Sequence, residues 1–119
     1  MLYHNILVWR KAHELTLKIY LITKNYPRDE LYGIVSQIRR ASSSVPANIV
    51  EGNARRSSKE FAQYLIQARG SLSETQYFLE LSRDLNYITE SDYLNMIDMS
   101  TEVAKMLNSL ITKIKSLSY

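Results

Sequence analysis

Apolar residues recur at spacings of three and four along almost the whole chain. This period matches an α-helix rather than the two-residue alternation of a β-strand. Only three glycines and two prolines interrupt the pattern, so long helices are expected. The sequence therefore predicts an all-α protein, and four helices with short connections indicate an antiparallel up-and-down four-helix bundle.

The first helix is predicted from about residue 6 to residue 25. It ends there because Pro27 disfavours helical geometry in the residue before it, Tyr26. One apolar stripe of this helix should face the core. The stripe consists of Val8, Ala12, Leu15, Ile19 and Ile22.

The second helix is predicted to be capped by Asp29 and to keep one apolar face to about Gly52. Pro46 lies inside this helix and lacks the amide that would bond to the Ser42 carbonyl, so it should kink the helix or divide it in two. Three hydroxyls just ahead of the proline are expected to meet the freed backbone groups. They belong to Ser42, Ser43 and Ser44.

Capping signals predict where the third and fourth helices begin. Ser57 and Glu60 have the spacing of a capping box, and Thr89 with Asp92 repeats it. Asn86 stands where the third helix should stop. The expected core stripe of the third helix is Phe61, Leu65, Ala68, Leu72, Thr75, Leu79 and Ser82. That of the fourth is Tyr93, Ile97, Ser100, Ala104, Leu107, Ile111 and Ile114.

Length and composition exclude several classes of protein. A chain of 119 residues without an internal linker or repeat predicts one domain, residues 1–119. The absence of cysteine and the presence of only two histidines exclude disulfides, thiol catalysis and a histidine-rich metal site. No stretch approaches the roughly 20 apolar residues of a membrane span, and the first residues lack the basic region of a secretory signal. A cytoplasmic protein is expected.

Charge is distributed unevenly along the chain. Residues 1–69 carry 11 Lys and Arg against five Asp and Glu, whereas residues 70–119 carry four against seven. The two halves can neutralise each other inside a folded bundle, or the basic half can present a face to a polyanion. The candidates for contact with nucleic acid are Arg10, Lys11, Lys18, Arg39, Arg40, Arg55, Arg56 and Lys59.

Two interpretations stay open for these basic residues. They are either solvated surface side chains or phosphate contacts, in which case binding falls steeply with salt. Glu51 and Arg55 have the i, i+4 spacing of an intrahelical ion pair, which stabilises a helix by about 0.2–0.5 kcal/mol. In the alternative arrangement, Glu51 accepts a buried Arg40 from a neighbouring subunit.

A second apolar surface is expected beside the core stripes. Its predicted members are Tyr20, Tyr32, Tyr64 and Tyr77, together with Ala62, Ile66 and Phe78. A lone small bundle does not need such a surface, so it predicts self-association. Gly70 in mid-helix costs about 1 kcal/mol relative to alanine, which close approach of a neighbouring helix would explain. The predicted oligomer interface contains Tyr32, Glu51, Tyr64, Gly70 and Tyr77.

A dispersed set of motifs covers roughly residues 6–88. It comprises Val8, Trp9, Ala12, Glu30, Tyr32, Gly33, Gln37, Arg39, Arg40, Ala41, Asn48, Ile49, Glu51, Gly52, Phe61, Leu65, Ala68, Gly70, Ser71 and Glu74. This set resembles the bacterial four-helix-bundle family named for open reading frames in 23S ribosomal RNA intervening sequences. That family looks related to the accessory protein of diversity-generating retroelements, a homopentamer of four-helix bundles that binds nucleic acid and a reverse transcriptase. The resemblance implies a homopentamer with a basic nucleic-acid-binding surface.

An enzyme is not expected. The sequence has no Glu-x-x-His pair, no phosphate-binding glycine loop and no nucleophile beside a histidine, so neither a cofactor nor a metal is predicted. We predict an oligomeric accessory protein that binds RNA or DNA, and the resemblance adds a reverse transcriptase or a ribosomal-RNA-associated protein as a partner. The alternative is an oligomeric scaffold that binds a protein partner and no nucleic acid. Salt-sensitive binding would distinguish the first from the second.

Overall fold

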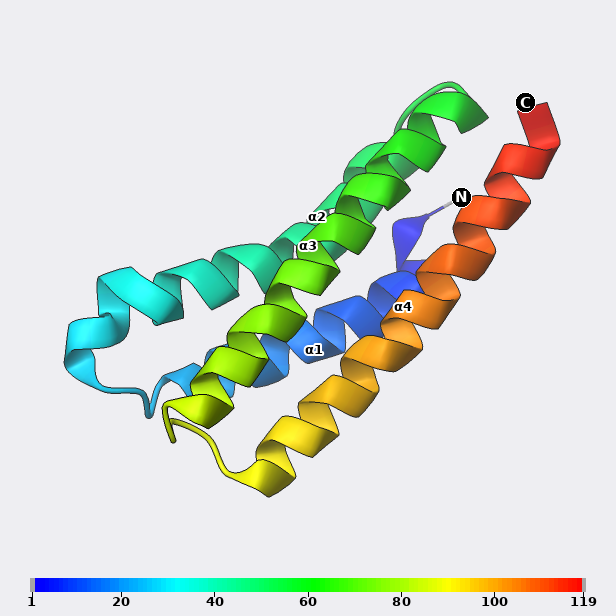
Figure 1. Ribbon diagram of the computed structural model, residues 1–119. Coiled ribbons are helices and arrows are strands. Elements are labelled where there is room, and N and C mark those ends of the chain that lie inside the picture. Colours follow the sequence, from blue (N-terminus) through cyan, green and yellow to red (C-terminus); the bar gives the residue numbers. More distant parts are fainter. Residues whose placement is uncertain (1, 119) are drawn as a thin grey trace.

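The computed structural model describes residues 2–118, and the secondary structure within that range is entirely helical. Four long helices run antiparallel in chain order and form an up-and-down bundle of 47 × 24 × 21 Å (Figure 1). They are α1 (Leu7–Thr23), α2 (Ser36–Asn53), α3 (Ser58–Asp84) and α4 (Glu90–Ser118). Three short turns complete the structure: η1 (Tyr3–Asn5), η2 (Arg28–Glu30) and the wider η3 (Leu31–Val35). The predicted fold class is confirmed.

The core follows the predicted stripes closely in α1 and α3. In α1 the predicted residues are buried except Ile22, which is partly buried at the margin. In α3 the predicted residues are buried except Phe61, which packs against the core from its edge. These stripes bury the apolar side chains that drive the four helices together.

In α4 the buried stripe is rotated relative to the predicted one. Met96 and Val103 are fully buried, whereas Ile97 and Ala104 are only partly buried. Each buried residue directly precedes a predicted one, and both members of each pair are apolar. The hydrophobic pattern therefore did not distinguish two neighbouring stripes, and packing against α1 and α3 selected the other one. Three residues of the predicted stripe are buried as expected: Ser100, Leu107 and Ile111.

α2 runs unbroken through Pro46, so of the two predicted effects of this proline, a kink or a division, the division does not occur. The proline leaves the Ser42 carbonyl without its intrahelical donor. The hydroxyl of Thr16 on α1 lies 3.0 Å from that carbonyl oxygen and also 3.0 Å from the Ala12 carbonyl oxygen, so its one proton is shared between the two acceptors and partly replaces the missing bond. The serine hydroxyls bond elsewhere: Ser42 and Ser43 donate to carbonyls of α2, and Ser44 pairs with a serine of α3. A neighbouring helix, rather than the local serine run, therefore compensates for the proline.

The helical segment that leads into α2 is capped by Glu30, not by Asp29 as predicted. One oxygen of the Glu30 carboxylate accepts the Ile34 amide at 3.4 Å, and the other accepts the Tyr87 hydroxyl at 2.6 Å. Gly33 leaves room for this carboxylate, because a Cβ at position 33 would lie 2.5 Å from Glu30 Oε1. The bond to Glu30 raises the pKa of Tyr87 to about 12. Since Tyr87 follows α3, the carboxylate links the approach to α2 with the α3–α4 turn.

The caps of α3 and α4 confirm the two capping predictions. Ser57 Oγ accepts the Glu60 amide at 3.1 Å, and Thr89 Oγ1 accepts the Asp92 amide at 3.0 Å. These side chains satisfy amides that the first turn of a helix leaves without a backbone acceptor. The starts of α3 and α4 are thus encoded locally in the sequence.

Asn86 closes the end of α3 in the left-handed backbone conformation, with φ of 63°. Its amide donates to the Arg83 carbonyl, and the amide of Tyr87 donates to the Ser82 carbonyl, both at 2.9 Å. This pair of bonds is the Schellman arrangement, in which glycine or asparagine fits best. The predicted stop at Asn86 is therefore confirmed.

None of the helices within residues 2–118 is long and apolar enough to cross a membrane.

Candidate nucleic-acid interface

Three segments that are far apart in the sequence meet at one end of the bundle: the start of the chain, the α2–α3 turn and the end of α4 (Figure 1). A hollow at this end is lined from all three segments by Asn5, Ile6, Asn53, Phe61, Leu110, Lys113, Ile114 and Leu117. Residues 2–11, 51–60 and 105–118 carry eight Lys and Arg against two Asp and Glu. We term these three segments the basic end.

The opposite end of the bundle has the reverse charge balance on two of its helices. Residues 74–102 form the second part of α3, the α3–α4 turn and the first part of α4, and they carry one Arg against seven Asp and Glu. Residues 18–40 of α1, the α1–α2 connection and α2 lie at the same end and carry five Lys and Arg against two Asp and Glu, so this end has six cations against nine carboxylates. The balance of charge therefore changes sign along the long axis of the bundle. The change does not follow the halves of the chain, because the lysines at the end of α4 lie with the basic residues of the other helices.

Two of the predicted nucleic-acid contacts on α1 are engaged with α4. Lys11 forms an ion pair with Glu102 at 3.4 Å. Lys18 donates a hydrogen bond to the side-chain oxygen of Asn95. Both interactions join neighbouring helices, so these two lysines have a structural role within the subunit.

Two of the predicted arginines pack on tyrosine rings. Arg39 donates to Thr23 Oγ1 at 2.9 Å and to the Tyr20 carbonyl at 3.2 Å, and its guanidinium lies 4.7 Å from the centre of the Tyr20 ring. These contacts fasten α2 to the end of α1. Arg55 donates to the Tyr64 hydroxyl at 2.6 Å, and its guanidinium lies 4.8 Å from the centre of that ring.

Four of the predicted cations are exposed, and none has an ion-pair or side-chain hydrogen-bond partner among residues 2–118: Arg10, Arg40, Arg56 and Lys59. Arg56 lies in the α2–α3 turn, and Lys59 lies in the first turn of α3. With Arg10 near the start of α1, they belong to the basic end. Arg40 lies further along α2, outside it. The basic end therefore holds three unpaired members of the predicted set.

A cluster of four aromatic rings lies at the start of α1. Trp9 stacks on His13 with ring centres 4.9 Å apart and an angle of 10° between the planes. Tyr3 stacks on His4 at 4.1 Å, and both rings meet Trp9 edge-on. Trp9, His13 and Tyr3 are partly exposed, and His4 is exposed. The cluster and the exposed Arg10 thus both lie at the start of α1.

Comparison with known proteins places the chain in a family. The family model of the 23S rRNA-intervening sequence protein matches residues 4–109. The chain belongs to this family. A solved structure from Bacteroides thetaiotaomicron, described as a protein with unknown function from the S23 ribosomal protein family, is similar with a TM-score of 0.81. It shares 32% sequence identity, and the match covers 89% of this chain and 96% of that one. Curated protein sequences gave no match.

In this member of the 23S rRNA-intervening sequence family, three residues of the predicted oligomer interface are exposed. Tyr32 is 92% exposed and Tyr77 is 56% exposed. Gly70 lies on an open surface, because a Cβ built on it would meet no atom within 4 Å. The other two, Glu51 and Tyr64, both contact Arg55 of the same chain.

The predicted second apolar surface was partly wrong. Ala62 is fully buried, and Ile66 and Phe78 pack against the core of the same subunit. They complete the core because α3 has neighbours on both sides of its central stripe. The exposed large apolar residues lie instead chiefly on and after α1, and they include Leu7, Leu17, Tyr20, Leu21, Leu31 and Tyr32.

Lys105, Lys113 and Lys115 are not among the predicted contacts. They follow the acidic first part of α4 and belong to a half of the chain with net negative charge. Only the antiparallel packing of α4 brings them to the basic end. The sequence did contain a signal for these lysines, because residues 103–118 contain three Lys and no Asp or Glu.

Among the described residues, no group of three or more His, Asp or Glu is placed to hold a metal ion.

Proposed function

We propose that this protein is a non-enzymatic, oligomeric accessory protein of the cytoplasm that binds RNA or DNA through its basic end. The observation that carries the proposal is the set of unpaired cations there. Arg10, Arg56 and Lys59 are exposed and have no acidic partner within residues 2–118. Cationic side chains without internal partners are available to neutralise phosphates and release their counterions.

The position of Lys59 supports this role. A cation in the first turn of a helix opposes the helix dipole, so Lys59 does not stabilise α3. Lys11 and Arg55, by contrast, stabilise contacts within the subunit. We therefore assign phosphate contact to Arg10, Arg56 and Lys59, and we expect weak discrimination between sequences.

The aromatic cluster favours ligands with unpaired bases. Rings beside a cation can stack on bases that are not held inside a duplex. Trp9 and His13 present such rings at the same end of α1 as Arg10. Single-stranded loops or ends should therefore bind more tightly than a duplex of equal charge.

Self-association would multiply the effect of each basic end. The family resemblance implies a homopentamer, and the exposed Tyr32, Tyr77 and Gly70 support an interface on these surfaces. Several basic ends on one particle would bind one nucleic acid at high effective concentration.

The test is a titration of the protein into fluorescently labelled structured RNA and matching duplex DNA at several salt concentrations. The test variant carries Arg56→Ala and Lys59→Ala. Its matched control carries Lys24→Ala and Arg28→Ala, which remove the same charge from exposed sites outside the basic end. The test pair should weaken binding and reduce the slope of log K against log salt by about two, whereas the control pair should retain the wild-type slope.

The fluorescence of Trp9, the single tryptophan, reports separately on base stacking. Quenching by single-stranded RNA, without quenching by duplex DNA, would support the stacking role. Equal weakening by both pairs, or no binding at low salt, would overturn the proposal. An apolar, salt-insensitive association with a protein would instead favour the scaffold alternative.

A further inference from the structure

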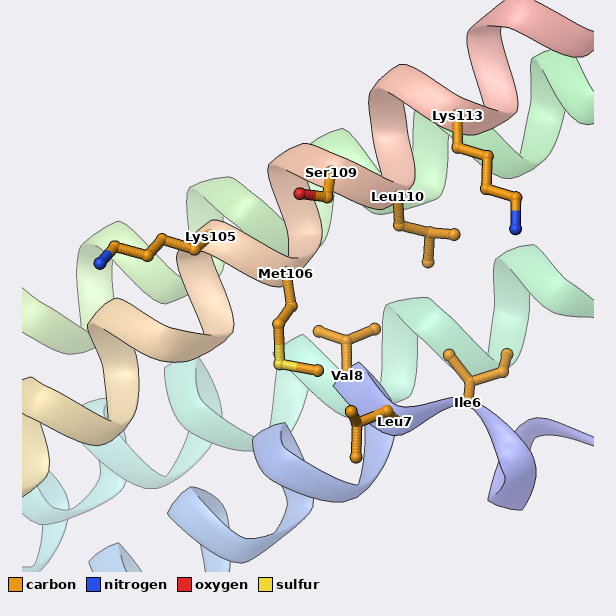
Figure 2. A pocket seen from close by; sticks show the side chains of 8 residues that line it. All are labelled: Ile6, Leu7, Val8, Lys105, Met106, Ser109, Leu110 and Lys113. Atoms are coloured by element: carbon orange, nitrogen blue, oxygen red, sulfur yellow. The ribbon is translucent and has the colours of Figure 1, made fainter.

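The end of α4 lacks a full-length neighbour on the side of α1. α1 has 17 residues and begins at Leu7, whereas α4 has 29 residues and continues to Ser118. Beside the start of α1 lies an open groove of about 400 Å³ (Figure 2). A second hollow of about 350 Å³ shares Ile6, Leu110 and Lys113 with it. The two hollows therefore adjoin, and we term them together the α4 groove.

The floor of the α4 groove is apolar. Ile6 and Val8 face Met106 and Leu110 across it, and Leu7 lines its edge with the side chain directed away from α4 (Figure 2). The adjoining hollow continues the apolar side of α4 through Ile114 and Leu117. The four α4 residues are separated by four, four and three positions, which is the spacing of one helix face. The groove thus exposes an apolar helix face of the kind that another helix covers in a bundle.

The rim of the groove is cationic. Lys105 and Lys113 lie at its two ends, eight residues apart, or about 12 Å along the helix axis (Figure 2). Both are exposed, and neither has an ion-pair or hydrogen-bond partner in the described part of the chain. Within residues 2–118, no acidic residue lines either hollow. A ligand that fits this groove combines apolar anchors with flanking negative charge.

We propose that the α4 groove docks an acidic amphipathic helix of a protein partner. Apolar residues at i, i+4 and i+7 of that helix cover the floor, and flanking Asp or Glu residues pair with Lys105 and Lys113. Charge complementarity selects this occupant, because a basic helix would meet two unpaired lysines. A phosphate backbone matches the rim but leaves the apolar floor uncovered, so this site differs from the proposed phosphate contacts.

The experiment measures binding of a labelled amphipathic peptide to the full-length protein by fluorescence anisotropy. One peptide carries Leu on its apolar face and Glu on its flanks, and its partner peptide carries Lys in place of Glu. Wild type should prefer the acidic peptide by at least about tenfold, as expected for loss of a charge pair plus like-charge repulsion. The variant with Lys105→Glu and Lys113→Glu should prefer the basic peptide.

Two control variants test whether the preference for the acidic peptide arises in the α4 groove. Lys24→Glu with Arg28→Glu makes the same charge change outside the groove and should retain the wild-type preference. Leu7→Ala removes a half-exposed part of the groove edge and should weaken the acidic peptide severalfold without unfolding the bundle. Far-ultraviolet circular dichroism verifies that every variant is folded.

Three outcomes would overturn the proposal. Wild type fails to prefer the acidic peptide, or the two charge-reversed variants change the preference equally. Alternatively, the groove variant loses self-association by analytical ultracentrifugation, which would assign the groove to a second copy of this chain. RNA is also tested as a competitor of the acidic peptide. Displacement would overturn a separate site if Leu7→Ala weakened RNA binding as much as it weakened peptide binding.

Discussion

The Thr16 hydroxyl of α1 lies 3.0 Å from the Ser42 carbonyl oxygen of α2, at the position where Pro46 has removed the backbone donor, and 3.0 Å from the Ala12 carbonyl oxygen of its own helix. Both Thr16 and Ser42 are buried, so water is not available to replace this bond. A buried carbonyl without a donor costs about 1–3 kcal/mol. The threonine therefore allows a proline in the middle of a continuous helix.

Thr16→Val should destabilise the protein by about 1–3 kcal/mol, because it keeps the shape of the side chain and removes the donor. Pro46→Ala restores an amide that is able to bond to the Ser42 carbonyl. In that background, Thr16→Val should cost clearly less. Urea unfolding of the four combinations measures the coupling, and Thr16→Ser is the control that keeps the hydroxyl. Equal costs in both backgrounds would show that the two residues do not act on the same carbonyl.

Tyr87→Phe should alter the pH dependence of stability at alkaline pH. The Glu30 carboxylate raises the pKa of Tyr87 from 10.0 to about 12, so the folded protein holds this proton more tightly than the unfolded chain does. The stability that the bond between Tyr87 and Glu30 contributes is fully present below about pH 10 and is lost as the pH rises towards about 12. Urea unfolding at neutral pH and near pH 11 should show a smaller alkaline loss for Tyr87→Phe than for wild type.

The matched control for Tyr87→Phe is Tyr32→Phe, which removes a hydroxyl from a ring that is 92% exposed. This control should retain the alkaline slope of wild type. A wild-type slope in Tyr87→Phe as well would mean that the bond to Glu30 does not bias the titration.

Asn86→Ala should destabilise the protein by about 1 kcal/mol, because alanine tolerates the left-handed conformation less well than asparagine does. Asn86→Gly should retain wild-type stability, since glycine adopts a φ of 63° without a steric penalty. Thermal unfolding of the two variants tests the difference. If both melted alike, the conformation at Asn86 would not be the determinant of this turn.

Gly70→Leu should reduce the size of the oligomer and leave the subunit folded. A Cβ at Gly70 meets nothing within 4 Å in the subunit, so any steric effect has to come from another subunit. Light scattering measures the size, and Thr101→Leu on exposed α4 surface is the control. An unchanged size for Gly70→Leu would remove this glycine from the predicted interface.

Gly52, unlike Gly70, lies against other side chains of the same subunit. A Cβ there would lie 2.7 Å from Tyr64 Cβ and 2.8 Å from Phe61 Cδ1. Gly52→Ala should therefore destabilise the subunit itself by about 1–3 kcal/mol through overpacking.

The local features of this fold were predictable from the sequence. Ser57, Thr89 and Asn86 act on backbone groups within a few residues of themselves, so their roles follow from spacing alone. Features that depend on contacts between helices were not predictable from the sequence. The choice of Thr16 as the donor to α2 and of Met96 over Ile97 in the core depends on how whole helices pack.

The candidate site was predictable in part for the same reason. Sequence alone selected Arg10, Arg56 and Lys59, which are exposed and have no ion-pair partner in the described part of the chain. It did not separate them from Arg39, which fastens α2 to α1 through Thr23. Residue type and spacing reveal charge, whereas the partner of each charge depends on the tertiary structure.

For the proposed binding of nucleic acid, the change in charge balance along the bundle predicts an orienting effect. A particle 47 Å long, with eight Lys and Arg against two Asp and Glu at the basic end and six against nine towards the other end, is an electric dipole. In the field of a nucleic acid such a dipole experiences a torque as well as an attraction. The torque turns the basic end forward during the last approach, within about a Debye length of 10 Å at 0.1 M salt. Molecules that arrive sideways are thereby reoriented, so a larger share of collisions begins with the productive end in front.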